Sequence, residues 1–230
     1  MLVLVVLPQF AACSPFPDQA ELVGKPCVAG FDLGATDDFS AFALVWDLLD
    51  GSYAVKVRFW VPEGAVTRYP NRPYDVWRRA GVLEVTTAYP FTTDFELVQR
   101  AIEADCRQWG VKEIAYDSRM ATQMGMALEG AGFVMVNTPQ GFALNEAVRL
   151  VMKLITDGQL RHGHNPILSW MAGNVVTREG IKGDIRIDKQ HAPEKIDGFS
   201  ALVTAFDRIV RKPTEPPSVY ETRGFATVGG

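Results

Sequence analysis

The order of strand-like and helix-like segments is the feature that most constrains the fold of this chain. Three apolar runs come first, at residues 27–33, 40–47 and 53–61, and the last alternates with the two-residue period of a strand. Asp50-Gly51 is typical of a tight hairpin turn between the second and third runs. Beyond residue 92 helical and extended segments alternate, and such an order predicts a mixed sheet with helices on both faces.

The second half of the chain supplies these alternating segments. A helix is expected from Thr93, which with Glu96 has the spacing of a capping box, to Gly110. Residues 62–92 lack periodicity, so we expect a long irregular segment there, with a helical turn at 74–80. We expect strands at 112–117 and 133–137, helices at 119–130, 144–157, 166–175 and 196–210, and a hairpin over 176–188. Ribonuclease H-like folds have this order, so the predicted class is an α/β, ribonuclease H-like mixed sheet, an antiparallel meander plus parallel strands.

Composition excludes several other classes of protein. The 230 residues carry a net charge of −4, which argues against wrapping nucleic acid by bulk positive charge. Three cysteines without C-x-x-C spacing predict neither a disulfide framework nor structural zinc, and favour a reducing cytosol. No apolar run reaches the roughly 18 residues of a membrane helix, so no membrane association is expected. We divide the chain into a linker or truncation remnant (1–22), one domain (23–211) and a flexible tail (212–230).

Three aspartates occupy the ends of predicted elements. Asp32 comes near the end of the first strand, Asp117 ends the fourth, and Asp197 opens the final helix. If the first and fourth strands are neighbours, these carboxylates converge, and their repulsion requires cations. Mg²⁺ and Mn²⁺ prefer such oxygen ligands, and two ions can drive phosphodiester hydrolysis. Asp38, in the turn after the first strand, is a weaker candidate ligand, and helix capping or turn chemistry remains the alternative role for each aspartate.

Four segments together resemble a known family. They read GFDLGATDDFSAFALVW, EIAYDSRMATQM, QLRHGHNPILSWMAGNVV and EKIDGFSALVTAF. In order and spacing they resemble the nuclease domain of tailed-bacteriophage terminase large subunits, the DNA-packaging motor proteins, over residues 23–211. The resemblance implies a ribonuclease H-like fold that binds two divalent cations, Mg²⁺ or Mn²⁺, and cuts concatemeric double-stranded DNA. It assigns Asp32, Asp117 and Asp197 as catalytic metal ligands and matches Asp38 to a recurrent second aspartate.

The resemblance also implies partners and a location. Family members act with an ATPase domain, a terminase small subunit and a portal, in the cytoplasm of the infected or lysogenic bacterial host. This chain lacks a G-x-x-x-x-G-K-[ST] loop, so it is not expected to hydrolyse ATP itself. The isolated domain is expected to be monomeric.

Contacts to DNA are harder to place from the sequence. The better candidates for contacts to the DNA backbone are the cationic residues around the late hairpin and before Asp197, namely Lys182, Arg186, Lys189 and Lys195. His162 is a further candidate. A second basic and aromatic stretch, residues 68–79, suits either DNA or another protein surface.

Two other interpretations of the sequence remain open. Residues 30–36, GFDLGAT, resemble the phosphate-binding turn of the actin and sugar-kinase superfamily, although the second phosphate loop of that superfamily is missing. Another ribonuclease H-like nuclease, of the resolvase or transposase type, is the second alternative.

Overall fold

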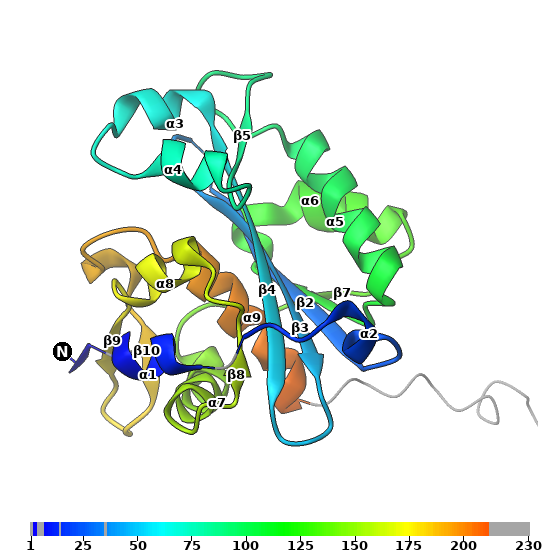
Figure 1. The fold of residues 1–230 in the computed structure, drawn as a ribbon, viewed down its shortest axis with the longest axis vertical. Helices are drawn as coiled ribbons and strands as arrows, with labels where there is room; N and C mark the ends of the chain where they lie inside the picture. The colour runs from blue at the N-terminus through cyan, green and yellow to red at the C-terminus, as the bar shows by residue number, and fades with distance from the viewer. Residues whose placement is uncertain (1, 4–6, 14, 35, 212–230) are drawn as a thin grey trace, which may run out of the picture.

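A mixed sheet forms the centre of the computed structural model, which describes residues 2–3, 7–13, 15–34 and 36–211. In the described residues the sheet has seven strands in the order β5-β4-β3-β2-β6-β7, with β8 paired to β4 (Figure 1). The β2–β3 and β3–β4 pairs are antiparallel, and all other pairs in this sheet are parallel. The predicted meander plus parallel strands is thus confirmed. The bounds are β2 (Cys27–Asp32), β3 (Ser40–Asp47), β4 (Tyr53–Pro62), β5 (Glu84–Thr86), β6 (Ile114–Tyr116), β7 (Met135–Asn137) and β8 (Leu160–Arg161).

Alternation along the central strands divides the core between the two faces of the sheet. On β2, Ala29 and Phe31 pack in one cluster, whereas Val28 belongs to the other. Helices α5 (Phe95–Trp109) and α6 (Ser118–Gly130) cover the first face. The second face is covered by α7 (Asn145–Thr156), α8 (Pro166–Ala172) and α9 (Asp197–Arg211) (Figure 1). Asp32, even-numbered like Val28, therefore lies on the side of α9.

Strand β2 and helix α9 approach each other closely because small residues line their contact. A Cβ built on Gly30 would lie 2.5 Å from the backbone nitrogen of Ala205 and 2.7 Å from the carbonyl oxygen of Ala201. Only glycine permits this spacing. The close approach brings the carboxyl end of β2, with Asp32, beside the first turn of α9, with Asp197.

Residues 62–92 are more regular than the sequence predicts. They form α3 (Glu63–Arg68), α4 (Tyr74–Arg79) and β5, and α4 coincides with the expected turn at 74–80. The side chains of Tyr74 and Trp77 are buried against the sheet. Elements of six residues or fewer are too short to produce a clear period, which is why the pattern missed α3 and β5.

The N-terminal segment packs against the domain. It contains β1 (Leu2–Val3), α1 (Leu7–Ala12) and α2 (Gln19–Leu22). Phe10 and Cys13 are buried in the same core cluster as α7 and α8. The boundary that we placed at residue 23 stays a prediction, and the tail from 212 onward lies outside the described residues.

The late hairpin forms a small second sheet. Strands β9 (Val176–Glu179) and β10 (Ile185–Ile187) pair with each other, and β1 pairs with β9. Two 3₁₀ turns, η1 (Phe142–Leu144) and η2 (Lys189–His191), complete the elements of the described chain. All three cysteines are free and buried, as the prediction of no disulfide framework requires. Among the described residues, no helix is long and apolar enough to cross a membrane.

A candidate metal centre in an acidic cleft

Two of the predicted aspartates lie at the ends of neighbouring parallel strands. Asp32 is the last residue of β2, and Asp117 follows β6, which pairs with β2. Parallel strands end at the same edge of a sheet, so both residues lie at that edge. Asp117 also caps α6, because its carboxylate accepts a hydrogen bond of 3.0 Å from the backbone nitrogen of Arg119.

The other two aspartates reach the same edge from a turn and a helix. Asp38 lies between β2 and β3, and its Oδ1 accepts a hydrogen bond of 2.8 Å from the backbone nitrogen of Phe39. Asp197 is the first residue of α9 and is only 9% exposed. Its Oδ2 is buried and has no hydrogen-bond partner among the described residues.

All four carboxylates line one cleft of about 720 Å³. The predicted cluster of Asp32, Asp38, Asp117 and Asp197 is therefore brought together. Arg119, Gln140 and a fifth aspartate, Asp188, line the same cleft, and the sequence analysis did not single them out. Arg119 lies two residues after Asp117, a spacing that would have suggested it; no comparable pattern marks Gln140.

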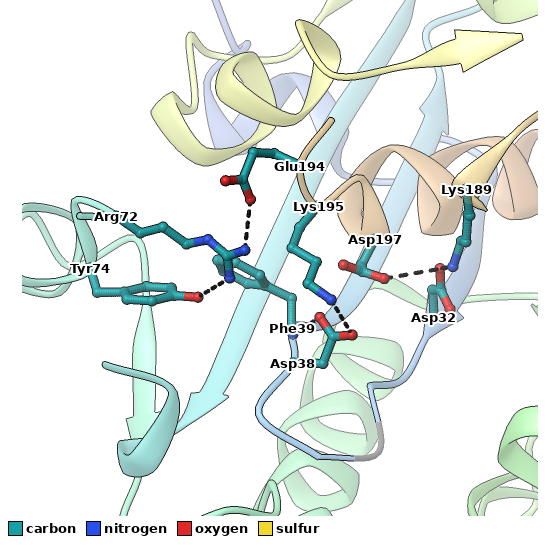
Figure 2. Close-up of polar contacts among 9 residues, drawn as sticks. All are labelled: Asp32, Asp38, Phe39, Arg72, Tyr74, Lys189, Glu194, Lys195 and Asp197. Atoms are coloured by element: carbon teal, nitrogen blue, oxygen red, sulfur yellow. Dashed lines mark hydrogen bonds and ion pairs between the residues drawn. The ribbon is translucent and has the colours of Figure 1, made fainter. Parts of the chain in front are cut away.

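Two lysines neutralise part of this acidic cluster. Lys189 forms an ion pair with Asp32, and its Nζ lies 3.6 Å from Oδ1 of Asp197. Lys195 donates a hydrogen bond of 2.7 Å to Oδ2 of Asp38. Figure 2 shows these two groups side by side, one around each lysine. Both lysines were predicted to contact DNA, and in this structure both contact carboxylates.

The electrostatics of the cleft reflect crowded negative charge. Burial, together with repulsion from Asp32, raises the pKa of Asp197 to about 7. Partial desolvation of its ammonium group would lower the pKa of Lys189, but attraction to Asp32 and Asp197 outweighs it and leaves that pKa above its ordinary value. The charged form of a carboxyl group whose pKa is raised in this way is stabilised by added cations.

The donor set suits hard divalent cations. Four carboxylates offer only oxygen ligands, and the unpartnered Oδ2 of Asp197 is a buried acceptor aimed at no protein donor in the described chain. As the side chains stand, however, no three His, Cys, Asp or Glu groups of the described residues converge tightly enough to enclose an ion. Lys189 contacts Asp32 and Asp197, so an ion bound between these two carboxylates requires its ammonium group to withdraw, whereas Lys195 contacts Asp38.

The remaining residues that were predicted to contact DNA differ in where they lie relative to the cleft. Arg186, on β10, lines the cleft and places its guanidinium 5.0 Å from the ring centre of Phe142. Lys182 is exposed at the hairpin turn and does not line the cleft. The prediction for His162 is not supported, because the ring is 3% exposed, stacks on Phe10 and has Nε2 2.9 Å from that residue's carbonyl oxygen. Its role here is in packing.

The basic and aromatic stretch at 68–79 mostly makes contacts within the protein. Arg68 pairs with Asp37. Arg72 pairs with Glu194 at 2.6 Å while donating to the hydroxyl of Tyr74 (Figure 2). The ion pair of Arg72 holds the segment just before Lys195. This stretch therefore supports the cleft more than it offers free cations to a ligand.

Comparison with known proteins settles the family. A family model described as "Terminase large subunit, endonuclease domain" matches residues 12–212. The chain belongs to the terminase large subunit endonuclease family. This membership confirms the resemblance of the four sequence segments and favours a terminase nuclease over the resolvase, transposase and kinase-like alternatives.

Individual relatives agree with this assignment. The terminase large subunit of Enterobacteria phage HK97 is 30% identical over 180 residues, which is 76% of this chain and 35% of that protein. The crystal structure of the HK97 large terminase superimposes with a TM-score of 0.80 at 27% identity, covering 89% of this chain and 43% of that one. This terminase nuclease chain thus spans less than half of those relatives.

A more distant structure supports the fold. The large terminase nuclease of thermophilic phage G20c, solved with bound magnesium, superimposes with a TM-score of 0.55 at 11% identity. The match covers 90% of this chain and 99% of that one. Terminase nuclease domains have a ribonuclease H-like fold, and the predicted fold class is confirmed.

Proposed function

We propose that this chain is a metal-dependent endonuclease domain that cuts concatemeric double-stranded DNA during viral genome packaging. The observation that carries the proposal is the gathering of four carboxylates from separate elements in one cleft of a terminase nuclease domain. Carboxylates gathered in one cleft repel one another, and bound cations relieve that repulsion.

Each aspartate has a role in the proposal. Asp32, Asp117 and Asp197 hold two divalent cations, Mg²⁺ or Mn²⁺, and Asp38 contributes as a weaker ligand. Two bound cations supply a nucleophilic hydroxide and stabilise the leaving oxygen in phosphodiester hydrolysis. The protein contributes fixed positions: Asp32 and Asp197 are held together by the close packing of β2 on α9, and Asp117 by its cap on α6.

Cationic side chains around the cleft would orient the DNA backbone. Arg186 lines the cleft, Lys189 and Lys195 can turn from carboxylates to phosphates, and Lys182 extends the surface along the hairpin. With a net charge of −4, the domain has little bulk attraction for DNA. The ATPase domain, terminase small subunit and portal are the proposed partners, in the cytoplasm of the infected or lysogenic bacterial host, and the isolated domain is proposed to be a monomer.

Supercoiled-plasmid cleavage tests this function. The purified chain is incubated with Mn²⁺, Mg²⁺ or EDTA, alongside Asp117→Asn and Asp197→Asn. Asp75→Asn is the matched control, because Asp75 is an exposed residue of α4 outside the cleft. We expect nicking and linearisation that need metal and are lost in the two cleft variants but kept in the control. Cleavage that persists in both cleft variants would contradict the assignment of the site.

A further inference from the structure

The ammonium group of Lys189 lies where the cleft would otherwise need a cation. It forms ion pairs with both Asp32 and Asp197, which come from different elements of the fold. Lys195, in contrast, pairs with Asp38 and with no other carboxylate of the described residues. Lys189 is therefore the lysine that bridges the two carboxylates held together by the packing of β2 on α9 (Figure 2).

The backbone that carries Lys189 is anchored through its neighbour Asp188, which also lines the cleft. The backbone nitrogen of Asp188 donates a hydrogen bond of 2.8 Å to the carbonyl oxygen of Val176. The carboxylate of Asp188 is 6% exposed and contacts Arg178 at 3.1 Å and His191 at 2.9 Å. These contacts fix the start of η2 to the hairpin, so the segment does not have to move for the ammonium to leave.

The side chain of Lys189 has room to change position. It is 43% exposed and lines an open cleft of about 720 Å³. A lysine has a flexible four-carbon stem, so its head can leave two carboxylates while the backbone stays in place. Rotations about the bonds of this side chain are enough to move its ammonium group away from the two carboxylates.

We propose that Lys189 is a built-in competitor for the divalent cation: its ammonium group neutralises Asp32 and Asp197 in the metal-free protein and is displaced when the cation binds. The inference rests on the proposed function, since it takes the two aspartates as metal ligands. Removing the lysine leaves two close carboxylates without a cation, which destabilises the metal-free fold and favours any divalent ion that enters. The lysine thereby lowers the metal affinity of the cleft and keeps the metal-free site intact.

Calorimetric titration of Mn²⁺ into the full 230-residue chain tests the inference without requiring catalysis. We compare the wild-type protein with Lys189→Met, and with Lys195→Met as a matched control that removes one positive charge from the same cleft. We expect Lys189→Met to bind Mn²⁺ roughly tenfold more tightly, equivalent to about 1.4 kcal/mol, and Lys195→Met to change the affinity much less.

Thermal melting supplies a second readout on the same proteins. In EDTA, Lys189→Met should melt at a lower temperature than the wild type, and added Mn²⁺ should raise its melting temperature by more than it raises that of the wild type. Lys189→Gln is measured in parallel, so that a folding defect specific to methionine does not decide the result.

Failure of this inference can be told apart from failure of the proposed function. If the wild type binds Mn²⁺ and neither Lys189 variant binds it more tightly, the competitor role is overturned while the metal site stands. Equal gains in Lys189→Met and Lys195→Met would also overturn it, because they would reflect net charge alone. If none of the proteins binds Mn²⁺, the proposed metal site itself is wrong, and this inference fails with it.

Discussion

The contact between Gly30 and α9 makes a quantitative prediction for Gly30→Ala. The new methyl group would lie 2.5 Å from the nitrogen of Ala205, so an ordinary contact of 3.4 Å requires a displacement of about 0.9 Å. Both near atoms belong to the helix backbone and cannot rotate away. Overpacking of this kind costs up to about 3 kcal/mol, and alanine recovers up to about 1 kcal/mol of backbone entropy. We therefore expect Gly30→Ala to lower the free energy of unfolding by about 2 kcal/mol.

Urea unfolding followed by tryptophan fluorescence measures this change, since Trp46 and Trp60 are fully buried. Gly130→Ala is the matched control, because a Cβ there meets nothing within 4 Å and the residue is the last of α6. The control should be neutral or up to about 1 kcal/mol more stable. A Gly30→Ala protein within about 0.5 kcal/mol of the wild type would refute the claim that this contact is rigid.

Three further predictions concern groups outside the cleft. Arg208→Ala should lower the free energy of unfolding by about 3–5 kcal/mol in the same urea assay, because it leaves Glu113 buried and unpaired; a loss below about 1 kcal/mol would contradict this. Burial raises the pKa of Cys106 to about 12, so a thiol reagent at pH 8 should label Cys106 only after unfolding. Burial lowers the pKa of His162 in the folded protein, so the unfolded chain binds the proton more tightly and stability should fall as the pH drops below about 6.5. His162→Phe should flatten that dependence, and an unchanged slope would exclude His162 as its source.

The strands and long helices were predictable because their patterns are local. The run at 40–47 coincides with β3, and the amphipathic spacing after residue 94 coincides with α5. The helix start was misplaced by one residue, since Asp94 rather than Thr93 is the cap and accepts from the backbone nitrogen of Leu97 at 3.0 Å. Thr93 is buried instead, and burial cannot be read from the spacing of polar residues.

The acids of the cleft were predictable as a group, but their partners were not. Asp32, Asp117 and Asp197 were identified by their positions at element ends, which depend only on order along the chain. The ion pair of Lys189 with Asp32 joins residues 157 positions apart, and no local pattern encodes it. His162 was misjudged for the same reason, because its burial depends on Phe10, 152 positions away.

The register of β2 has a consequence for how this protein tolerates insertions. Asp32 pairs with Ala41 on one side, while Gly30 pairs with Ala43 and with Ala115 on the other, so a slip by one residue would turn Asp32 toward α5 and α6. The turn at 48–52 lies at the opposite end of the strands. Extra residues there lengthen a loop at small entropic cost and leave the paired positions unchanged. Length variation should therefore be accepted at that end of the sheet and rejected between Gly30 and Asp32.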